Sequence, residues 1–135
     1  MDKTKWPQGP WTDEPDCKVF ITAVGLPASI VRNGVGALCG YVGVDRSHPW
    51  FGEGYDDIDY SDVHGGLTYA GMGRASCGED ESLWYFGFDC AHSGDLCPSM
   101  LQYHDGFEGD VYRNISYVTE QIEELAKQIQ EAKEQ

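Results

Sequence analysis

The sequence predicts a single α+β domain, in which a mainly antiparallel, twisted sheet of about four to six strands is packed by a C-terminal amphipathic helix. Three observations predict this class. The chain has 135 residues, enough for one hydrophobic core but too few for two. Short β-branched and aromatic runs alternate with turns rich in the 17 glycines and 6 prolines. Near the end of the sequence, apolar residues recur every three or four positions, which is the helical period.

The first 24 residues are predicted to form an irregular arm followed by a strand. Residues 1–16 are rich in Pro, Gly, Asp and Trp and have no periodicity, so we expect an irregular arm preceding a domain over 17–135. Trp6 and Trp11 are too apolar to remain in water and should fold back onto the domain. Residues 18–24 (KVFITAV) have the composition of a strand.

A hairpin is predicted at Asn33-Gly34, because both residues accept the positive φ of a type I′ turn. Residues 28–32 before it are compatible with a strand or a turn of helix. Residues 36–44 (GALCGYVGV) after it are typical of a central strand whose glycines leave room for a neighbouring backbone or a ligand.

Residues 45–62 form a long loop, and loops of this length in a compact domain tend to be functional. Its aromatic residues, Trp50 among them, either form a lid over a ligand or fill the outside of the core. The acids of the loop lack the ligand spacing of a calcium-binding EF-hand and are predicted to be solvated; they are Asp56, Asp57, Asp59 and Asp62.

Two further strands are predicted at 63–70, interrupted by Gly65-Gly66, and at 83–90. Each joins a strand-forming run to a turn that carries His, Asp and Gly, which is how binding sites are commonly placed at a sheet edge. We expect the two strands to pair. Their pairing should bring four polar side chains to one pocket, namely His64, Asp89, His92 and Asp95.

Residues 115–133 are predicted to be a helix with one apolar stripe, formed by Ile115, Val118, Ile122, Leu125, Ile129 and Ala132. Asn114 or Ser116 can cap its start, and Glu123 and Lys127 have the spacing of an ion pair. We expect the helix to cover one face of the sheet. The length of the stripe also favours a homodimer, although it is too short for a coiled coil.

Charge and cysteine content limit the partners and the compartment. A net charge of -14 disfavours direct binding of nucleic acid or of an anionic membrane, because both would be repelled. No apolar run is long enough to span a membrane and no signal peptide is recognised, so we expect a soluble, cytoplasmic protein. The 5 cysteines form no Cys-x-x-Cys pair and are expected to be reduced thiols.

Several chemistries are compatible with the polar cluster. Two histidines and two carboxylates can bind a divalent metal that activates water for hydrolysis. The structural alternative is that Asp89 and Asp95 cap turns while the histidines donate to backbone carbonyls. Zinc binding by Cys90, His92 and Cys97, with Cys77 as a fourth ligand, matches no known spacing. A nucleophilic Cys90 activated by His64 is a further alternative, but a cysteine at the end of a buried strand is more often inert.

Aromatic and directional groups together favour a pocket for a nucleoside-like ligand. Flat aromatic faces would pack against the base, while His, Asp and the Gly-rich turns would supply donors and acceptors. No catalytic residue, metal ligand or cofactor is assigned. The predicted ligand-binding residues are His64, Gly65, Gly66, Tyr69, Trp84, Asp89, His92, Asp95 and Trp50.

Three segments resemble a family of small uncharacterised proteins from bacteriophages and mobile elements: GYVGV (40–44), DVHGGLTY (62–69) and WYFGFDCAHSGD (84–95). The resemblance extends over about residues 38–130. It implies a setting and no activity. Small acidic phage proteins often counter host defence, either by sequestering a nucleotide signal or by blocking a defence protein.

Three functions are therefore compatible with the sequence. The first, which we favour, is sequestration of a small nucleotide-derived ligand of host defence signalling without turnover, in the host cell cytoplasm. The second is metal-dependent hydrolysis by His64, Asp89, His92 and Asp95. The third is inhibition of a basic host defence protein by an acidic surface.

Overall fold

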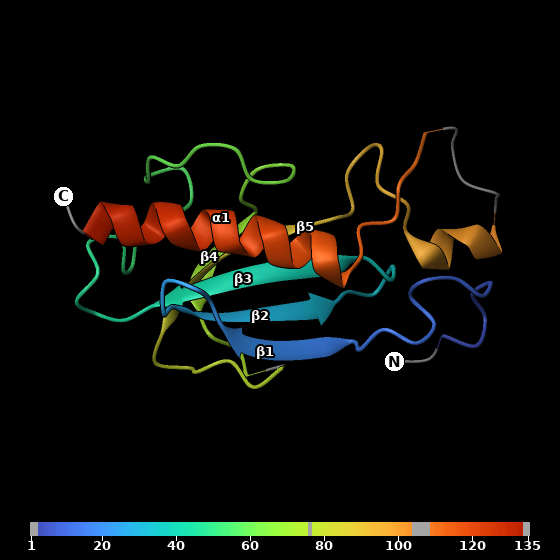
Figure 1. Cartoon of the computed structure of the whole chain (residues 1–135), viewed down its shortest axis with the longest axis horizontal. Coiled ribbons are helices and arrows are strands. Elements are labelled where there is room, and N and C mark those ends of the chain that lie inside the picture. Colours follow the sequence, from blue (N-terminus) through green and yellow to red (C-terminus); the bar gives the residue numbers. More distant parts are fainter. Residues whose placement is uncertain (1–2, 76, 104–108, 134–135) are drawn as a thin grey trace.

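The fold was described from a computed structural model, which places residues 3–75, 77–103 and 109–133. Within these residues, five strands form one antiparallel sheet in the order β1-β2-β3-β5-β4, and one long helix lies along it (Figure 1), which confirms the α+β class. The elements are β1 (Cys17–Ile21), β2 (Pro27–Arg32), β3 (Leu38–Val44), β4 (Tyr69–Met72), β5 (Trp84–Asp89), the short 3₁₀ helix η1 (Pro98–Gln102) and α1 (Ile115–Lys133).

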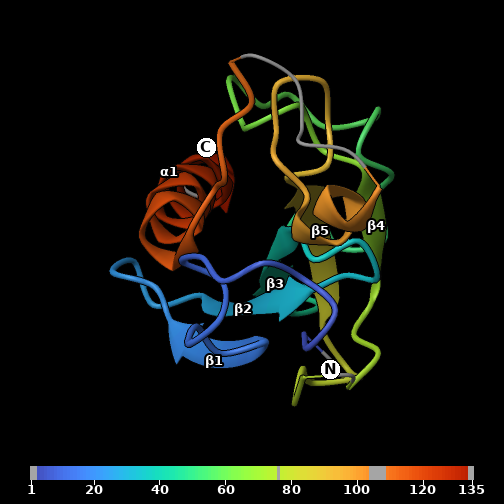
Figure 2. The same cartoon turned by 90° about the vertical axis from the view of Figure 1, so that its right-hand side faces the viewer.

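The core lies between α1 and one face of the sheet, as Figure 2 shows in a view along the layers. Phe86 and Phe88 of β5 point to this face, and their neighbours on either side point away from it. Helix α1 packs closely on β3 at Gly40, because a side chain at this position would overlap Phe88 of β5 and Ile122 of the helix. Val118, Ile122, Leu125 and Ile129 of the apolar stripe are fully buried in this contact, whereas Ile115 and Ala132 at its ends are partly buried, so most of the feature that favoured a homodimer is used inside the chain.

The opposite face of the sheet carries tyrosines. Register places Ser29, Tyr41, Gly87 and Tyr69 in one row across four strands. The segment between β4 and β5 passes over part of this face, on the side of the sheet away from α1 (Figure 1, yellow-green). The two faces therefore differ: one is the core and the other carries polar aromatic groups.

The first hairpin forms where it was predicted but with a different turn. Gly36 has a φ of 87°, whereas Asn33 and Gly34 are not in the positive-φ region that a type I′ turn needs. The Asn33 side chain accounts for the difference, because its Oδ1 accepts hydrogen bonds from the amides of Val35 and Ala37. These bonds hold a wider turn that closes at Gly36.

The strand predicted at 63–70 begins only at Tyr69. Gly65 and Gly66 have φ values of 67° and 81°, and the amide of Gly66 donates to the carbonyl of Val63. Two successive left-handed residues turn the chain and cannot continue a strand. His64 therefore lies in a turn and approaches the helix. The pairing of this segment with β5, through β4, is as predicted.

The N-terminal arm is tied to both the sheet and the helix. Trp6 and Trp11 are buried, as the sequence predicts. The carboxylate of Glu14 accepts hydrogen bonds from the amide of Ile115 and the hydroxyl of Tyr112. Asp16 accepts from the guanidinium of Arg32, whose side chain is fully buried.

Helix α1 has the predicted bounds, and its first turn is capped by Asn114, whose Oδ1 accepts from the amide of Tyr117 at 2.8 Å. The predicted ion pair of Glu123 with Lys127 is wrong. Lys127 lies 3.8 Å from Glu124, while Glu123 accepts a hydrogen bond from the amide of Ala23 and joins the helix to the turn after β1.

The expectation of reduced cysteines is wrong for two of them. Cys17 of β1 and Cys77 form a disulfide, with their Cα atoms 5.5 Å apart. Sequence spacing could not reveal this pair, because 60 positions separate the two residues and only the folding of the 73–83 segment over β1 brings them together. Disulfides persist mainly in oxidising compartments, so this bond weighs against the expected cytoplasmic location. None of the described helices combines the length and apolarity that crossing a membrane requires.

Candidate functional site

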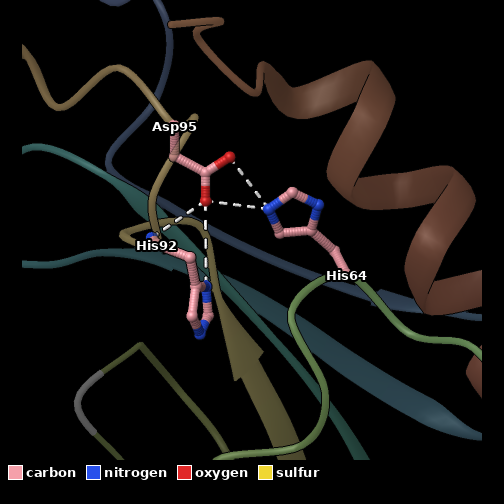
Figure 3. A group of neighbouring side chains, drawn as sticks. All are labelled: His64, His92 and Asp95. Atoms are coloured by element: carbon pink, nitrogen blue, oxygen red, sulfur yellow. Dashed lines mark hydrogen bonds and ion pairs between the residues drawn. The ribbon is translucent and has the colours of Figure 1, made fainter. Parts of the chain in front are cut away.

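A polar cluster is built at the end of β5 by a tight turn. The Oδ1 atom of Asp89 accepts from the amide of Ala91, which turns the chain out of the strand. Further along the turn, the Oδ2 atom of Asp95 accepts a hydrogen bond of 3.0 Å from the amide of His92, which lies three positions before it. These two bonds place the imidazole of His92 and the carboxylate of Asp95 on one side of the turn (Figure 3).

His64 reaches this turn from the other motif. Its backbone amide donates to Gln121 of α1, which fixes the Gly65-Gly66 turn against the helix. Its Nε2 lies 2.8 Å and 2.9 Å from the two carboxylate oxygens of Asp95, and its Nδ1 lies 2.6 Å from the hydroxyl of Tyr117. An ionised carboxylate only accepts, so Nε2 carries the proton and Nδ1 accepts from the phenol.

Asp95 is the centre of the cluster. Its side chain is 1% exposed and accepts from His64, from the amide of His92 and from Nε of Arg113 at 3.0 Å. Burial alone would raise the pKa of this carboxyl, but the three donors outweigh burial and hold the pKa below its ordinary value. Asp95 is therefore ionised at neutral pH and carries a fixed negative charge between two imidazoles.

His92 is positioned by contact with glycine. A side chain on Gly65 would overlap the imidazole ring, so the ring lies directly on the backbone of the Gly65-Gly66 turn. The Nδ1 atom of His92 lies 3.4 Å from Asp89 and 3.8 Å from Asp95. It is buried and makes no hydrogen bond to either residue.

The chain of Asp95, His64 and Tyr117 has the order of a catalytic triad, but its hydroxyl is a poor nucleophile. Burial raises the pKa of the Tyr117 phenol, which keeps it protonated. Burial also raises the pKa of the Cys90 thiol, and the charge of Asp95 adds to this effect. Only the thiolate reacts readily, so the Cys90 nucleophile suggested by the sequence is disfavoured. Cys77 is not available to zinc, because it is in the disulfide.

A separate cavity of about 120 Å³ lies on the tyrosine face, between the sheet and the segment after β4. The rings of Tyr41 and Tyr69 meet edge to face with centroids 5.6 Å apart, and the guanidinium of Arg74 lies 5.0 Å above the Tyr69 ring. Glu79 is buried at its base and accepts from the Ser29 hydroxyl and the Cys77 amide. The lining residues are Val31, Tyr41, Tyr69, Met72, Gly73, Arg74, Glu79 and Tyr85.

The residues predicted to share one pocket fall into three groups. His64, Gly65, His92 and Asp95 are in mutual contact, and Asp89 joins them through His92 while also accepting from Thr68. Gly66 closes the same turn. Tyr69 lies on the opposite face of the sheet from the core and lines the tyrosine cavity.

Trp50 and Trp84 form the third group, which lies neither in the His64 cluster nor in the tyrosine cavity. The Trp50 ring packs against Phe86 of the core at 6.2 Å, and His48 beside it bonds through Nε2 to the carbonyl of Ile129 in α1. The Trp84 ring packs against Phe51 and donates to the carbonyl of Glu53. The sequence left two possibilities for the aromatic residues of the long loop, a lid over a ligand or filling of the outside of the core. These contacts agree with the second.

Sequence reasoning missed several functional-site candidates. Tyr117 and Arg113 complete the His64 cluster, and only the helical register of 115–133 could have indicated that Tyr117 faces away from the apolar stripe. Tyr41 lies on the same sheet face as Tyr69, a relation that alternation would have revealed once the strand order was known. Arg74 and Glu79 lie in an irregular segment that has no sequence signal.

Comparisons with protein-family models, with curated proteins and with solved structures found no match to this chain.

Proposed function

We propose that the protein binds a small nucleotide-derived molecule in the tyrosine cavity and sequesters it without turnover. The observation that carries this proposal is the composition of the cavity: three tyrosine rings, one guanidinium and one buried carboxylate around a space of about 120 Å³. Ligand pockets commonly combine aromatic walls with a few polar groups that fix orientation. A space of this size is suited to one planar ring system, with the rest of the ligand outside.

Each part of such a ligand has a counterpart in the cavity. The base would stack on the face of one of the two rings, Tyr41 or Tyr69, and meet the edge of the other, because the rings stand at 90° to each other. The carboxylate of Glu79 retains acceptor capacity beyond its two existing bonds and can accept from amino or imino groups of a base. Arg74 can pair with a phosphate at the mouth of the cavity.

Binding without turnover is supported by the state of the nucleophilic and basic groups. Burial raises the pKa of Tyr41 and Tyr85, which keeps both phenols protonated and able to act as donors. Glu79 is the only carboxylate among the lining residues, and each of its oxygens already accepts one hydrogen bond from the protein. The cavity thus offers recognition groups and no activated nucleophile.

The resemblance to phage and mobile-element proteins gives the proposal its setting. Sequestration of a nucleotide signal in an infected host would counter a defence that depends on that signal. The strongly acidic charge fits a ligand held mainly through its base and ribose, with Arg74 as the single cation of the lining.

The proposal is tested by calorimetric titration of the full chain with nucleoside monophosphates, cyclic mononucleotides and cyclic dinucleotides. Tyr69→Ala should weaken binding by about 10-fold or more, because one stacked base contributes about 1–3 kcal/mol. Arg74→Ala should lower the affinity for phosphate-bearing ligands and leave the affinity for the corresponding nucleoside unchanged. Tyr103→Ala is the matched control, since this tyrosine is 77% exposed and outside the cavity.

Recovery of the ligand after denaturation, identified by mass spectrometry, distinguishes sequestration from turnover. We expect the added nucleotide to be recovered unchanged and in one-to-one stoichiometry. A converted nucleotide, absence of binding at millimolar concentration, or equal losses in Tyr69→Ala and Tyr103→Ala would each contradict the proposal.

A further inference from the structure

We propose that His64, His92 and Asp95 form a binding site for one divalent transition-metal ion of the zinc class. The three side chains each direct one ligand atom to a common point: Nε2 of His64, Nδ1 of His92 and Oδ2 of Asp95 (Figure 3). All three atoms lie within 4.8 Å of one another. This site is separate from the tyrosine cavity, none of whose lining residues belongs to it.

The distances are near those of a coordinated ion, but the two imidazoles must approach each other for coordination. Nε2 of His64 lies 2.8 Å from Oδ2 of Asp95, and Nδ1 of His92 lies 3.8 Å from the same oxygen. Ligand atoms around a tetrahedral zinc ion are about 3.4 Å apart, which follows from bonds of about 2.0–2.1 Å. Separating His64 from Asp95 by about 0.6 Å, and moving His92 closer to Asp95 by about 0.4 Å and to His64 by up to about 1.4 Å, would satisfy this geometry.

The atom that points most directly to a missing partner is Nδ1 of His92. It is buried, faces two carboxylates and makes no hydrogen bond in the described structure. Buried polar atoms are nearly always paired, so one without a partner needs a reason. A metal ion between His92 and Asp95 would supply that partner.

The surrounding groups are those that support metal ligands. The second nitrogen of His64 contacts the Tyr117 hydroxyl at 2.6 Å, and Oδ1 of Asp95 is held by Arg113. Such outer contacts fix the orientation of ligating side chains. On metal binding the proton of His64 moves from Nε2 to Nδ1, which then donates to the phenol oxygen, so that the imidazole stays neutral.

The ligand set selects the kind of ion. Two imidazoles favour zinc and its first-row neighbours over magnesium and calcium, which prefer oxygen ligands. Arg113 opposes a cation, but it is one partly exposed charge, whereas Asp95, Asp89 and the overall charge of -14 attract one. Three protein ligands leave a fourth position for water or another small ligand.

The test is titration of the full chain with Zn²⁺ in competition with a chromophoric chelator, accompanied by Co²⁺ absorption spectra. We expect one ion per chain and Co²⁺ bands without thiolate charge transfer. His92→Ala should weaken Zn²⁺ binding at least 100-fold, and Tyr117→Phe by about 10-fold, the usual effect of an outer contact. Zn²⁺ should raise the melting temperature of the wild type and not that of His92→Ala.

His92→Ala is the informative variant, because Nδ1 of His92, the proposed ligand atom, makes no hydrogen bond that the fold would lose. The matched control is the triple variant Asp56→Asn, Asp57→Asn and Asp59→Asn, which removes exposed acids from the long loop and should bind Zn²⁺ like the wild type. Unchanged affinity in His92→Ala, an equal loss in the triple variant, or a thiolate charge-transfer band would overturn the assignment.

Discussion

At the residue scale, the contact of His92 with Gly65 couples backbone conformation to side-chain position. Gly65 has a φ of 67° and also lies under the imidazole, so it has two reasons to be glycine. Gly25 has a φ of 89° with nothing within 4 Å of the place where a side chain would stand. A substitution at Gly25 therefore measures backbone strain alone, whereas one at Gly65 measures backbone strain together with the loss of close packing.

We expect Gly25→Ala to lower the free energy of unfolding by about 1 kcal/mol, which is the cost of a left-handed conformation for alanine. Gly65→Ala should cost about 3 kcal/mol, because displacement of His92 is added to the same strain. Urea denaturation of both variants measures the difference. Equal losses would mean that the imidazole does not lie against the Gly65 backbone in solution.

The pair of Asp16 and Arg32 makes stability depend on acid pH. Burial would raise the pKa of Asp16, but hydrogen bonds from Lys3 and Arg32 outweigh it and lower the pKa. A lowered pKa in the folded state stabilises the protein above the ordinary titration range of aspartate, near pH 4. This contribution disappears as the pH falls through the lowered pKa.

Asp16→Asn should therefore reduce stability at pH 7 and flatten its decline between about pH 5 and pH 2. Thermal denaturation at several pH values measures both effects. Asp13→Asn in the same arm is the control and should follow the wild-type profile. If the Asp16→Asn profile runs parallel to that of the wild type, the lowered pKa is not a property of the folded state.

At the element scale, the start of α1 is fixed by its cap and by the N-terminal arm. Asn114 satisfies the amide of Tyr117, and Glu14 satisfies the amide of Ile115 from an arm 101 positions away. Both groups supply acceptors to amides that have no partner within the helix. The arm thus orients the turn of α1 from which Tyr117 reaches His64.

Asn114→Ala should lower the free energy of unfolding by about 1 kcal/mol, the usual value of a helix cap. Ser116→Ala is the control and should change stability by a few tenths of a kcal/mol at most, because its side chain is exposed on the first turn. Chemical denaturation of both proteins provides the comparison. A larger effect of Ser116→Ala would assign the cap to Ser116, the other candidate from the sequence.

Among the elements, those with strong local patterns were predicted best. The helix has its predicted bounds because six apolar residues follow one period and a cap precedes them. The strand at 83–90 and the central strand after the hairpin were likewise found from composition alone. The strand at 63–70 was wrong in its first six residues, because the two left-handed glycines outweigh the β-branched and aromatic neighbours.

At the scale of the whole molecule, long-range pairing separates what could be predicted from what could not. The four polar residues expected to meet do so, because both motifs end beside β5: His64, His92 and Asp95 form one group, and Asp89 lies 3.4 Å from His92. The tyrosine cavity was not predicted as such, since it depends on strand order and on a segment held over the sheet by the Cys17–Cys77 bond. A sequence contains no local signal for either.

The disulfide should contribute to the stability of the whole chain. Loss of a cross-link that closes a loop of 60 residues lowers the free energy of unfolding by about 4 kcal/mol in the chain-entropy description. Cys17→Ser should show this loss in urea denaturation, whereas Cys97→Ser, which removes a free thiol, should not. Alkylation of the unreduced, denatured protein should label the free cysteines Cys39, Cys90 and Cys97 only; labelling of all 5 cysteines would contradict the bond.

The contacts of α1 with the long loop and the N-terminal arm also determine when the chain can fold. His48, Ser61 and His64 each bond to the helix across 53 to 81 positions, and Glu14 does so across 101. Contacts of such separation slow folding, because a long segment must close before they are made. During synthesis, β1, β2 and β3 emerge early but have no cover for their apolar face. The domain completes its core only after residues 115–133 have left the ribosome, so the apolar face of the sheet stays exposed to water until then.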